Sequence, residues 1–386
     1  MNEQMLAGIR EAMSLLQRDG PVAATDKIQQ TLRALMPAGT REGQATRRGD
    51  GAAARYARLP PVGEPAGFVP DLLARLRNEA PGIGTRFELP TAPRTNRQGP
   101  DSAPAPGKFL TGSFTNQAGT RAYKLYVPTA YHGQPLPLVV MLHGGGQSAD
   151  DFAAGTRLNE IAEAEPCLVL YPTQSAAANA TRCWNWFKDP DQQRDQGEPS
   201  LIAGMTRAVM DEYHVDPAKV YCAGLSAGGA MAVIMGATYP EVYAAVGAHS
   251  GMPYAAANDF ASAFAAMNGA AAPAASACLK GVPIIVFHGE RDERVHPRNS
   301  DHIVAQSIGQ PAAARITRGR AGTGHTYTQS VHAGPDGKVL AEQWLVHGAG
   351  HAWSGGSRRG SFTDEQGPDA SREMMRFFAA QSRAVG

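Results

Sequence analysis

The sequence predicts an α/β fold in which a mostly parallel sheet is covered by helices on both faces. Short apolar runs alternate with helix-length segments from residue 109 onward, which is typical of strands joined by crossover helices. Apolar residues make up 43% of the chain, enough to build a large core. The runs that we expect to form strands are 123–127, 138–142, 167–171, 220–223, 245–248, 284–287 and 343–346.

Ahead of this α/β region we expect an N-terminal helical extension. Two stripes of apolar residues with helical spacing flank a break at Asp19-Gly20-Pro21. We predict a helical hairpin over 1–37, a linker with one short helix over 38–108, and a catalytic domain over 109–386. One hairpin cannot bury its own apolar faces. It therefore packs on its own chain, or serves dimerisation or surface targeting, with a homodimer as one alternative.

Charge and hydropathy exclude several classes of partner. The chain has 36 Lys and Arg against 35 Asp and Glu, a net charge of +1, so we expect no nucleic acid partner. No apolar run approaches the ~18 residues that a membrane helix needs, so we expect no membrane span. Glu3, Arg10 and Glu11 stand where a secretory signal would be apolar or basic. The sequence thus favours a cytoplasmic protein, with extracellular placement as the alternative.

The four cysteines fall into two groups. Cys167 and Cys222 lie in apolar, strand-like runs and are predicted to be buried thiols. Cys183 and Cys278 lie in loop-like surroundings, so they are the pair that we suspect of a disulfide.

A candidate nucleophile stands in the motif Gly224-Leu225-Ser226-Ala227-Gly228. The motif directly follows an expected strand and precedes an apolar helical stretch that runs to about residue 238. This strand-turn-helix setting is the one that a nucleophile elbow requires. The glycines fit it because the sharp turn leaves no room for side chains two residues to either side of Ser226. The alternative is an ordinary serine in a glycine-rich turn.

A serine hydroxyl needs a base within hydrogen-bond reach and an acid that orients the base. Asp292 follows the expected strand 284–287, with Glu290 and Glu293 as rivals. After the last strand come His347 and His351. We favour His351, in a glycine-rich loop, as the base and His347 as a structural histidine. The chain order Ser, Asp, His is that of the α/β-hydrolase arrangement.

The developing oxyanion needs backbone N–H donors. We expect one from Ala227, directly after the nucleophile, and one from Gly145 in the turn His143-Gly144-Gly145-Gly146. A phosphate cradle is the competing interpretation of this turn, but the P-loop lysine and the dinucleotide-site spacing are both missing. Zinc-ligand spacing of cysteine or histidine and an H-E-x-x-H motif are missing too, so we expect no metal and no cofactor.

With these residues the sequence resembles the polyhydroxybutyrate (PHB) depolymerase family of esterases, α/β-hydrolases related to feruloyl and acetylxylan esterases. The resemblance runs from about residue 109 to 378. It implies Ser226, Asp292 and His351 as nucleophile, acid and base of a carboxylic ester hydrolase acting on short hydroxyacyl polyesters or oligomers. The motifs that carry it are LHGGGQ at 142–147, CWNWF at 183–187, AGLSAGGAM at 223–231, HGERDERVHP at 288–297 and GAGHAWSGG at 348–356.

Three tryptophans are candidate substrate-binding residues. Trp184 and Trp186 alternate as on an extended segment, so one of them is expected to face the cleft while the other packs inward. Trp353, two residues after His351, is a candidate for the cleft rim. The alternative is that these indoles belong to the core.

The main hypothesis is therefore a serine esterase that acts through an acyl-enzyme. A feruloyl or acetylxylan esterase is the first alternative, and a peptidase on the same fold is a weaker one. From another class, the chain could be a noncatalytic ligand- or polymer-binding protein that kept the fold. An intact set of Ser226, Asp292 and His351 argues against that reading, because a binder has no need of all three.

Overall fold

The protein is seen in a computed structural model that describes residues 105–270, 279, 281–308 and 314–384. These residues all belong to one compact unit, 89–386. The predicted hairpin over 1–37 and nearly all of the predicted linker over 38–108 lie outside the described residues and stay predictions.

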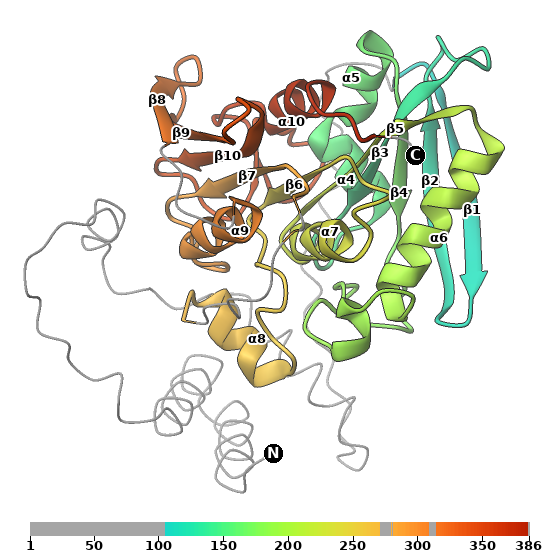
Figure 1. Ribbon diagram of the computed structural model, residues 1–386, viewed down its shortest axis with the longest axis horizontal. Helices are drawn as coiled ribbons and strands as arrows, with labels where there is room; N and C mark the ends of the chain where they lie inside the picture. The colour runs from blue at the N-terminus through green and yellow to red at the C-terminus, as the bar shows by residue number, and fades with distance from the viewer. Residues whose placement is uncertain (1–104, 271–278, 280, 309–313, 385–386) are drawn as a thin grey trace, which may run out of the picture. The chain divides into compact units, whose positions relative to one another are not determined.

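Among the described residues, ten strands form one sheet in the order β1-β2-β4-β3-β5-β6-β7-β10-β9-β8 (Figure 1). The neighbours from β4 to β10 in this order pair in parallel, and the strands at both edges pair antiparallel. The strands are β1 (Lys108–Asn116), β2 (Gly119–Val127), β3 (Leu136–Leu142), β4 (Leu168–Pro172), β5 (Val215–Leu225), β6 (Ala245–His249), β7 (Ile284–Gly289), β8 (Ala314–Arg320), β9 (Thr326–Ala333) and β10 (Val339–Val346).

Helices cover both faces of this sheet, as Figure 1 shows. Those whose apolar side chains join one core are α6 (Gly197–Glu212), α7 (Ala227–Thr238), α8 (Phe260–Met267) and α9 (Arg298–Ile308). Those that join the other core are α4 (Ala149–Thr156), α5 (Leu158–Ala164) and α10 (Ala370–Ala379). A 3-10 turn, η2 (Asp189–Gln192), precedes α6, and two short strands, β11 (Trp353–Ser354) and β12 (Thr363–Asp364), pair with each other.

The central strands are buried along their whole length. Every residue of β4, β6 and β7 is buried, as expected for parallel strands that carry helices on both faces. The predicted α/β fold with its mostly parallel sheet is confirmed, and each of the seven predicted strands is present.

Strands β1, β8 and β9 were not predicted from the sequence. β1 and β8 are the two edges of the sheet and their side chains are largely exposed, so neither shows a continuous apolar run. β9 pairs with β8 as an antiparallel hairpin, and its sequence TYTQSVHA is mainly polar.

The structure describes three of the four cysteines. Cys167 and Cys222 are buried free thiols, as predicted. Cys183 is half-buried, and its suspected partner Cys278 lies outside the described residues, so their disulfide stays a prediction.

Across the described part of the chain, no helix is both long enough and apolar enough to cross a membrane.

Candidate active site

The candidate catalytic residues all follow parallel strands at the carboxyl edge of the sheet. Ser226 comes directly after β5, Asp292 shortly after β7, and His351 after β10. Gly145 follows β3, which pairs with β5. Ligands and substrates bind at this edge in open α/β sheets. The fold thus gathers at one edge residues that are up to 206 positions apart in sequence, from Gly145 to His351.

Ser226 occupies a strained backbone position between β5 and α7. Its φ of 57° and ψ of −117° lie where L-residues rarely occur. Although Ser226 is the N-cap of α7, its side chain makes no capping hydrogen bond. The hydroxyl therefore does not satisfy the backbone of its own helix, and a sharp turn presents it, as a nucleophile elbow requires.

The flanking glycines are needed because the turn is crowded. A Cβ on Gly228 would lie 2.0 Å from the carbonyl oxygen of Leu142, and one on Gly224 would lie 2.4 Å from the carbonyl carbon of Gly228. Both obstacles are backbone atoms, which cannot rotate away. The steric interpretation of the motif is confirmed, and the close approach also brings the start of α7 against the end of β3.

Asp292 and His351 form a hydrogen-bonded pair. His351 Nδ1 lies 2.7 Å from Asp292 Oδ2. Because a carboxylate only accepts hydrogen bonds, Nδ1 carries the proton and Nε2 keeps its lone pair. Asp292 Oδ1 accepts from the backbone N–H groups of Arg294 and Val295, at 3.0 and 2.9 Å. The acid is thus fixed on one oxygen and orients the imidazole with the other.

The charge of Asp292 is strongly stabilised although the side chain is buried. Burial alone would raise the pKa of Asp292, but its electrostatic attraction to His351 and the hydrogen bonds from His288 and His351 outweigh it and hold the pKa well below its ordinary value. Asp292 therefore remains a carboxylate at neutral pH. A buried, ionised acid beside the imidazole stabilises the imidazolium form that a general base passes through.

The loop that carries His351 folds back over the neighbouring strands. A Cβ on Gly289 at the end of β7 would lie 2.4 Å from the carbonyl oxygen of Gly350. Farther along the loop, the N–H of Ser354 donates to His249 Nε2, at 3.0 Å, at the end of β6. The loop thus crosses β7 and reaches β6, which lies next to the strand that leads to Ser226.

Glu290 and His347, the alternative candidates for the acid and the base, contact each other. Glu290 Oε1 lies 3.2 Å from His347 Nδ1, and Glu290 Oε2 accepts from the N–H of Gly348 at 3.1 Å. His347 Nε2 also lies 2.8 Å from Thr328 Oγ1. The contacts with Glu290 join the end of β10 to the loop after β7, and the contact with Thr328 joins it to β9. His347 thus has a structural role, as predicted. Glu293 is exposed.

The glycine turn after β3 leaves one N–H free. The N–H of Gly144 donates to Gln147 Oε1 at 2.9 Å, and that of Gly146 donates to the carbonyl oxygen of Thr181 at 2.9 Å. Among the described residues, the N–H of Gly145 between them has no acceptor. The N–H of Ala227, the first residue of α7, also has no carbonyl within its own helix to bond. These two donors fit an oxyanion hole.

Sequence reasoning missed two buried histidines that hold the site together. The carbonyl oxygen of His249 accepts from the N–H of Ser226 at 2.8 Å, while its ring accepts from Ser354. Burial lowers the pKa of His249 to about 3, so the ring stays neutral and can accept. His288 Nε2 lies 2.7 Å from the carbonyl oxygen of Val295 and 3.4 Å from Asp292 Oδ2. Each directly follows a predicted strand, 245–248 or 284–287, and the sequence gives no other signal.

The three tryptophans are packed inside. Trp184, Trp186 and Trp353 are 0%, 4% and 1% exposed. Trp184 Nε1 donates to the carbonyl oxygen of His143, and Trp353 Nε1 donates to Ser371 Oγ, both at 3.0 Å. Trp186 packs edge-on against Phe187. Such burial favours the core alternative over the substrate-binding role, because residues already engaged by the core offer no open face to a ligand.

Metal ligation has no support in the described residues. They contain no group of three or more histidine, cysteine, aspartate or glutamate side chains that could hold an ion. The absence of metal and cofactor stays a prediction.

The esterase PHB depolymerase family matches residues 121–330, more than half of the chain. The chain belongs to this family. The match includes Ser226 and Asp292 and ends before His351.

Two relatives illustrate the range of named activities. Poly(3-hydroxyalkanoate) depolymerase C from Paucimonas lemoignei is 32% identical over 256 residues, 61% of this chain and 59% of the relative. Feruloyl esterase B from Neurospora crassa is 34% identical over 147 residues, 38% of this chain and 49% of the relative. The chain spans about half the length of the curated relatives that it matches.

Among solved structures, an acetyl xylan esterase from Aspergillus awamori superposes with a TM-score of 0.57 at 18% sequence identity. The superposition covers 70% of this chain and 99% of the esterase. At this identity the likeness concerns the fold. Together with the sheet order and the elbow after β5, it identifies the α/β-hydrolase fold.

Proposed function

We propose that the protein is a serine esterase that hydrolyses carboxylic esters, with short hydroxyacyl polyesters or oligomers of the polyhydroxybutyrate type as its substrates. The observation that carries the proposal is the Asp292–His351 hydrogen bond, at the sheet edge where the elbow presents Ser226. Family membership and similarity to a poly(3-hydroxyalkanoate) depolymerase support the substrate class.

In the first half-reaction, Ser226 Oγ attacks the ester carbonyl and His351 Nε2 takes its proton. Asp292 holds the imidazole and stabilises its charged form. The N–H groups of Gly145 and Ala227 bond the oxyanion of the tetrahedral intermediate. The intermediate collapses when His351 returns the proton to the leaving alcohol, which leaves an acyl group on Ser226.

In the second half-reaction, water replaces the alcohol. His351 takes a proton from the water, the hydroxide attacks the acyl carbonyl, and the same two N–H groups bond the second oxyanion. Ser226 leaves with the proton from His351 and the hydroxy acid is released. One site thus performs both steps with no further group.

The test compares the wild type with Ser226→Ala on p-nitrophenyl butyrate. We expect the substitution to lower kcat by roughly 10⁴- to 10⁶-fold, since the three residues act as a unit. A wild type without activity, or a variant as active as the wild type, contradicts the proposal and supports the noncatalytic binding alternative.

A feruloyl or acetylxylan esterase is the second candidate, because relatives with these names match more than a third of the chain. The discriminating measurement is kcat/KM on 3-hydroxybutyrate oligomers against feruloyl sugars and acetylated xylan. Higher kcat/KM on the oligomers supports the first candidate, and higher kcat/KM on the sugar esters supports the second.

The cytoplasmic placement and the homodimer stay predictions. Light scattering of the full chain in solution tests the dimer: a molar mass near twice 40.7 kDa supports it, and one near 40.7 kDa contradicts it.

A further inference from the structure

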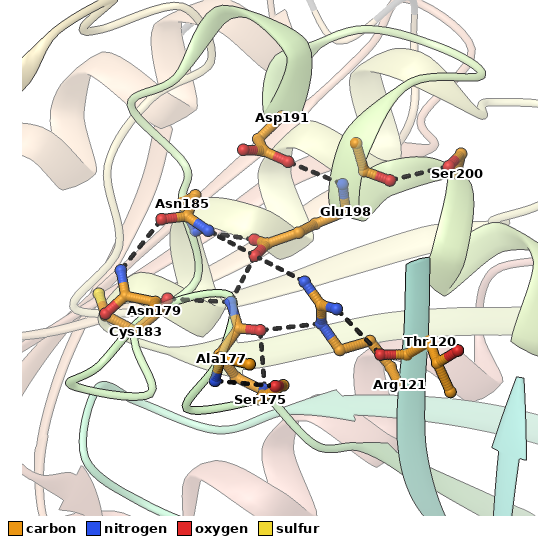
Figure 2. A network of polar contacts seen from close by, with 12 residues as sticks. Thr120, Arg121, Ser175, Ala177, Asn179, Cys183, Asn185, Asp191, Glu198 and Ser200 are labelled. Carbon is orange, nitrogen blue, oxygen red and sulfur yellow. Dashed lines mark hydrogen bonds and ion pairs between the residues drawn. The ribbon is translucent and has the colours of Figure 1, made fainter. Parts of the chain in front are cut away.

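A buried carboxylate on α6 is bonded by donors on every side. Glu198 is 2% exposed. Its Oε2 accepts from the N–H of Asn185, and its Oε1 accepts from Asn185 Nδ2, both at 2.7 Å. Oε1 also accepts from Gln174 Nε2 and lies 3.6 Å from Arg121 Nη2. Figure 2 shows Arg121 and Asn185 reaching the Glu198 carboxylate from separate parts of the chain.

Two of these partners delimit a stretch of chain that lies over the glycine turn. We call residues 174–185 the covering segment. The N–H of Gln174 donates to His143 Nε2 at 3.0 Å, and Trp184 Nε1 donates to the carbonyl oxygen of His143. The carbonyl oxygen of Thr181 accepts from Gly146. The residues on both sides of Gly144-Gly145 are therefore hydrogen-bonded to the covering segment.

Gly145 itself lies against the same segment. A Cβ on Gly145 would lie 3.5 Å from both Cβ and Sγ of Cys183. The carbonyl oxygen of Cys183 accepts from Gln174 Nε2 at 3.0 Å, and that amide also bonds Glu198. The chain of contacts from the Glu198 carboxylate to the Gly145 backbone thus has only two intervening residues.

We propose that Glu198 is a positioning residue for the oxyanion hole: its carboxylate fixes the covering segment and so sets the direction of the Gly145 N–H. The proposal deepens the proposed function and rests on it. An N–H donor stabilises the oxyanion only when it is aimed at the place where the charge develops. Glu198 makes no contact with Ser226, Asp292 or His351 among its hydrogen bonds and ion pairs, so its effect runs through the backbone.

A carboxylate suits this position better than an amide. The side-chain and backbone groups that bond Glu198 Oε1 and Oε2 are all donors. Glutamine would turn one acceptor into an NH₂ group facing those donors, which leaves buried groups unpaired. Glu198→Gln therefore keeps the shape of the side chain and removes the property that the proposal needs.

Glu342 provides a matched control. It is also buried, at 3% exposed, and it accepts from Gln329 Nε2, Trp344 Nε1 and Arg376. It lies on β10 and its partners belong to β9, β10 and α10, away from the covering segment. Glu342→Gln breaks a comparable buried network without touching the glycine turn.

Because burial raises the pKa of Glu198 to about 7, the experiment is run at pH 8, where Glu198 is mostly a carboxylate. It measures kcat and KM for p-nitrophenyl butyrate, the melting temperature, and the Ki of a trifluoromethyl ketone, which the nucleophilic serine attacks to form a tetrahedral oxyanion. For Glu198→Gln we expect kcat to fall about 10- to 100-fold and the ketone Ki to rise by a similar factor, while KM changes less than about twofold. For Glu342→Gln we expect a lower melting temperature with kcat and Ki within about twofold of the wild type.

Each possible result either supports or overturns the positioning role of Glu198. Wild-type kcat in Glu198→Gln, or a fall in kcat without a rise in Ki, overturns the positioning role. An equal loss of kcat in Glu342→Gln also overturns it, because the effect is then general destabilisation. If Glu198→Gln does not fold, Asn185→Ala, which removes one donor to Glu198, replaces it with an expected loss of several-fold in kcat and a parallel rise in Ki. An inactive wild type overturns the proposed function instead.

Discussion

Two buried carboxylates flank the candidate active site, and their surroundings give them opposite pKa shifts. Asp292, beside the proposed base His351, bonds that imidazole and two backbone N–H groups, and its pKa is held well below the ordinary value. Glu198, on the side of the proposed oxyanion hole, is also buried. There, burial raises the pKa to about 7 and the nearby negative charge of Asp191 adds to the shift, against opposing contributions from Gln174, Asn185 and Arg121.

The difference shows that partners rather than burial set the charge of an interior carboxylate. Burial disfavours the charged form at both sites. At Asp292 the contacts with the imidazoles of His351 and His288 overcome it, whereas at Glu198 neutral amides and an arginine 3.6 Å away do not. The acid–base side thus keeps a permanent charge, and the oxyanion side carries a carboxylate that titrates nearer neutrality.

Removing the charge on the acid–base side should have the largest effect on catalysis. Asp292→Asn replaces the acceptor that keeps the proton on His351 Nδ1, so Nε2 loses its lone pair in the favoured tautomer. We expect kcat on p-nitrophenyl butyrate to fall roughly 10³- to 10⁴-fold, well beyond the effect of Glu198→Gln. Glu290→Gln, which changes the structural pair with His347, is the control and should keep kcat within about tenfold. A smaller loss in Asp292→Asn than in Glu290→Gln would reassign the acid.

Breaking the link between the nucleophile and the base loop should have a smaller effect. His249→Phe keeps a ring between Phe287 and Trp353 but removes the acceptor for the N–H of Ser354. We expect kcat to fall about tenfold, because a buried unpaired N–H costs roughly 1–3 kcal/mol and loosens the loop that carries His351. His249→Gln, which retains an acceptor at similar reach, should recover part of the loss. Equal kcat values in the two variants would show that this hydrogen bond does not matter.

The two carboxylates should also impose opposite pH slopes on stability. Asp292 has a depressed pKa in the folded state, so its contribution is present above the unfolded value of about 3.9 and is lost as pH falls through the folded pKa. Glu198 has a raised pKa, so its contribution is present below the unfolded value of about 4.3 and is lost as pH rises through about 7. The contribution of Asp292 should therefore make the protein less stable as the pH falls, and that of Glu198 should make it less stable as the pH rises.

Melting temperatures from pH 3 to 8 check these slopes. The difference between wild type and Asp292→Asn should shrink as pH falls below about 4. The difference between wild type and Glu198→Gln should shrink as pH rises from about 4 to about 7, by a few degrees at most. Parallel slopes for the two variants would contradict the assigned pKa directions.

Much of the sheet could be predicted from the sequence because its centre is buried on both faces. Continuous apolar runs such as those of β4, β6 and β7 are visible without a structure. The edge strands β1 and β8 could not be found in this way, since their side chains face solvent and their pairing depends on neighbours.

At the site, the sequence indicated the order Ser226, Asp292, His351 but could not separate Asp292 from Glu290 by spacing alone. The structure pairs Asp292 with His351 and Glu290 with His347, which depends on how two loops meet after β7 and β10. Glu198 gave no signal, because its burial depends on groups as distant in sequence as Arg121. The alternation of Trp184 and Trp186 suggested that one of them faces the cleft, but the structure buries both side chains.

The most direct test of the central claim is to identify the residue that reacts as the nucleophile. The purified full chain is treated with a fluorophosphonate ester, which phosphonylates activated serines, and the labelled peptides are mapped by mass spectrometry. We predict one adduct, on Ser226, that forms in step with complete loss of esterase activity, and much slower formation of this adduct in Asp292→Asn. An adduct on another serine, or undiminished ester hydrolysis with Ser226 fully labelled, would contradict it.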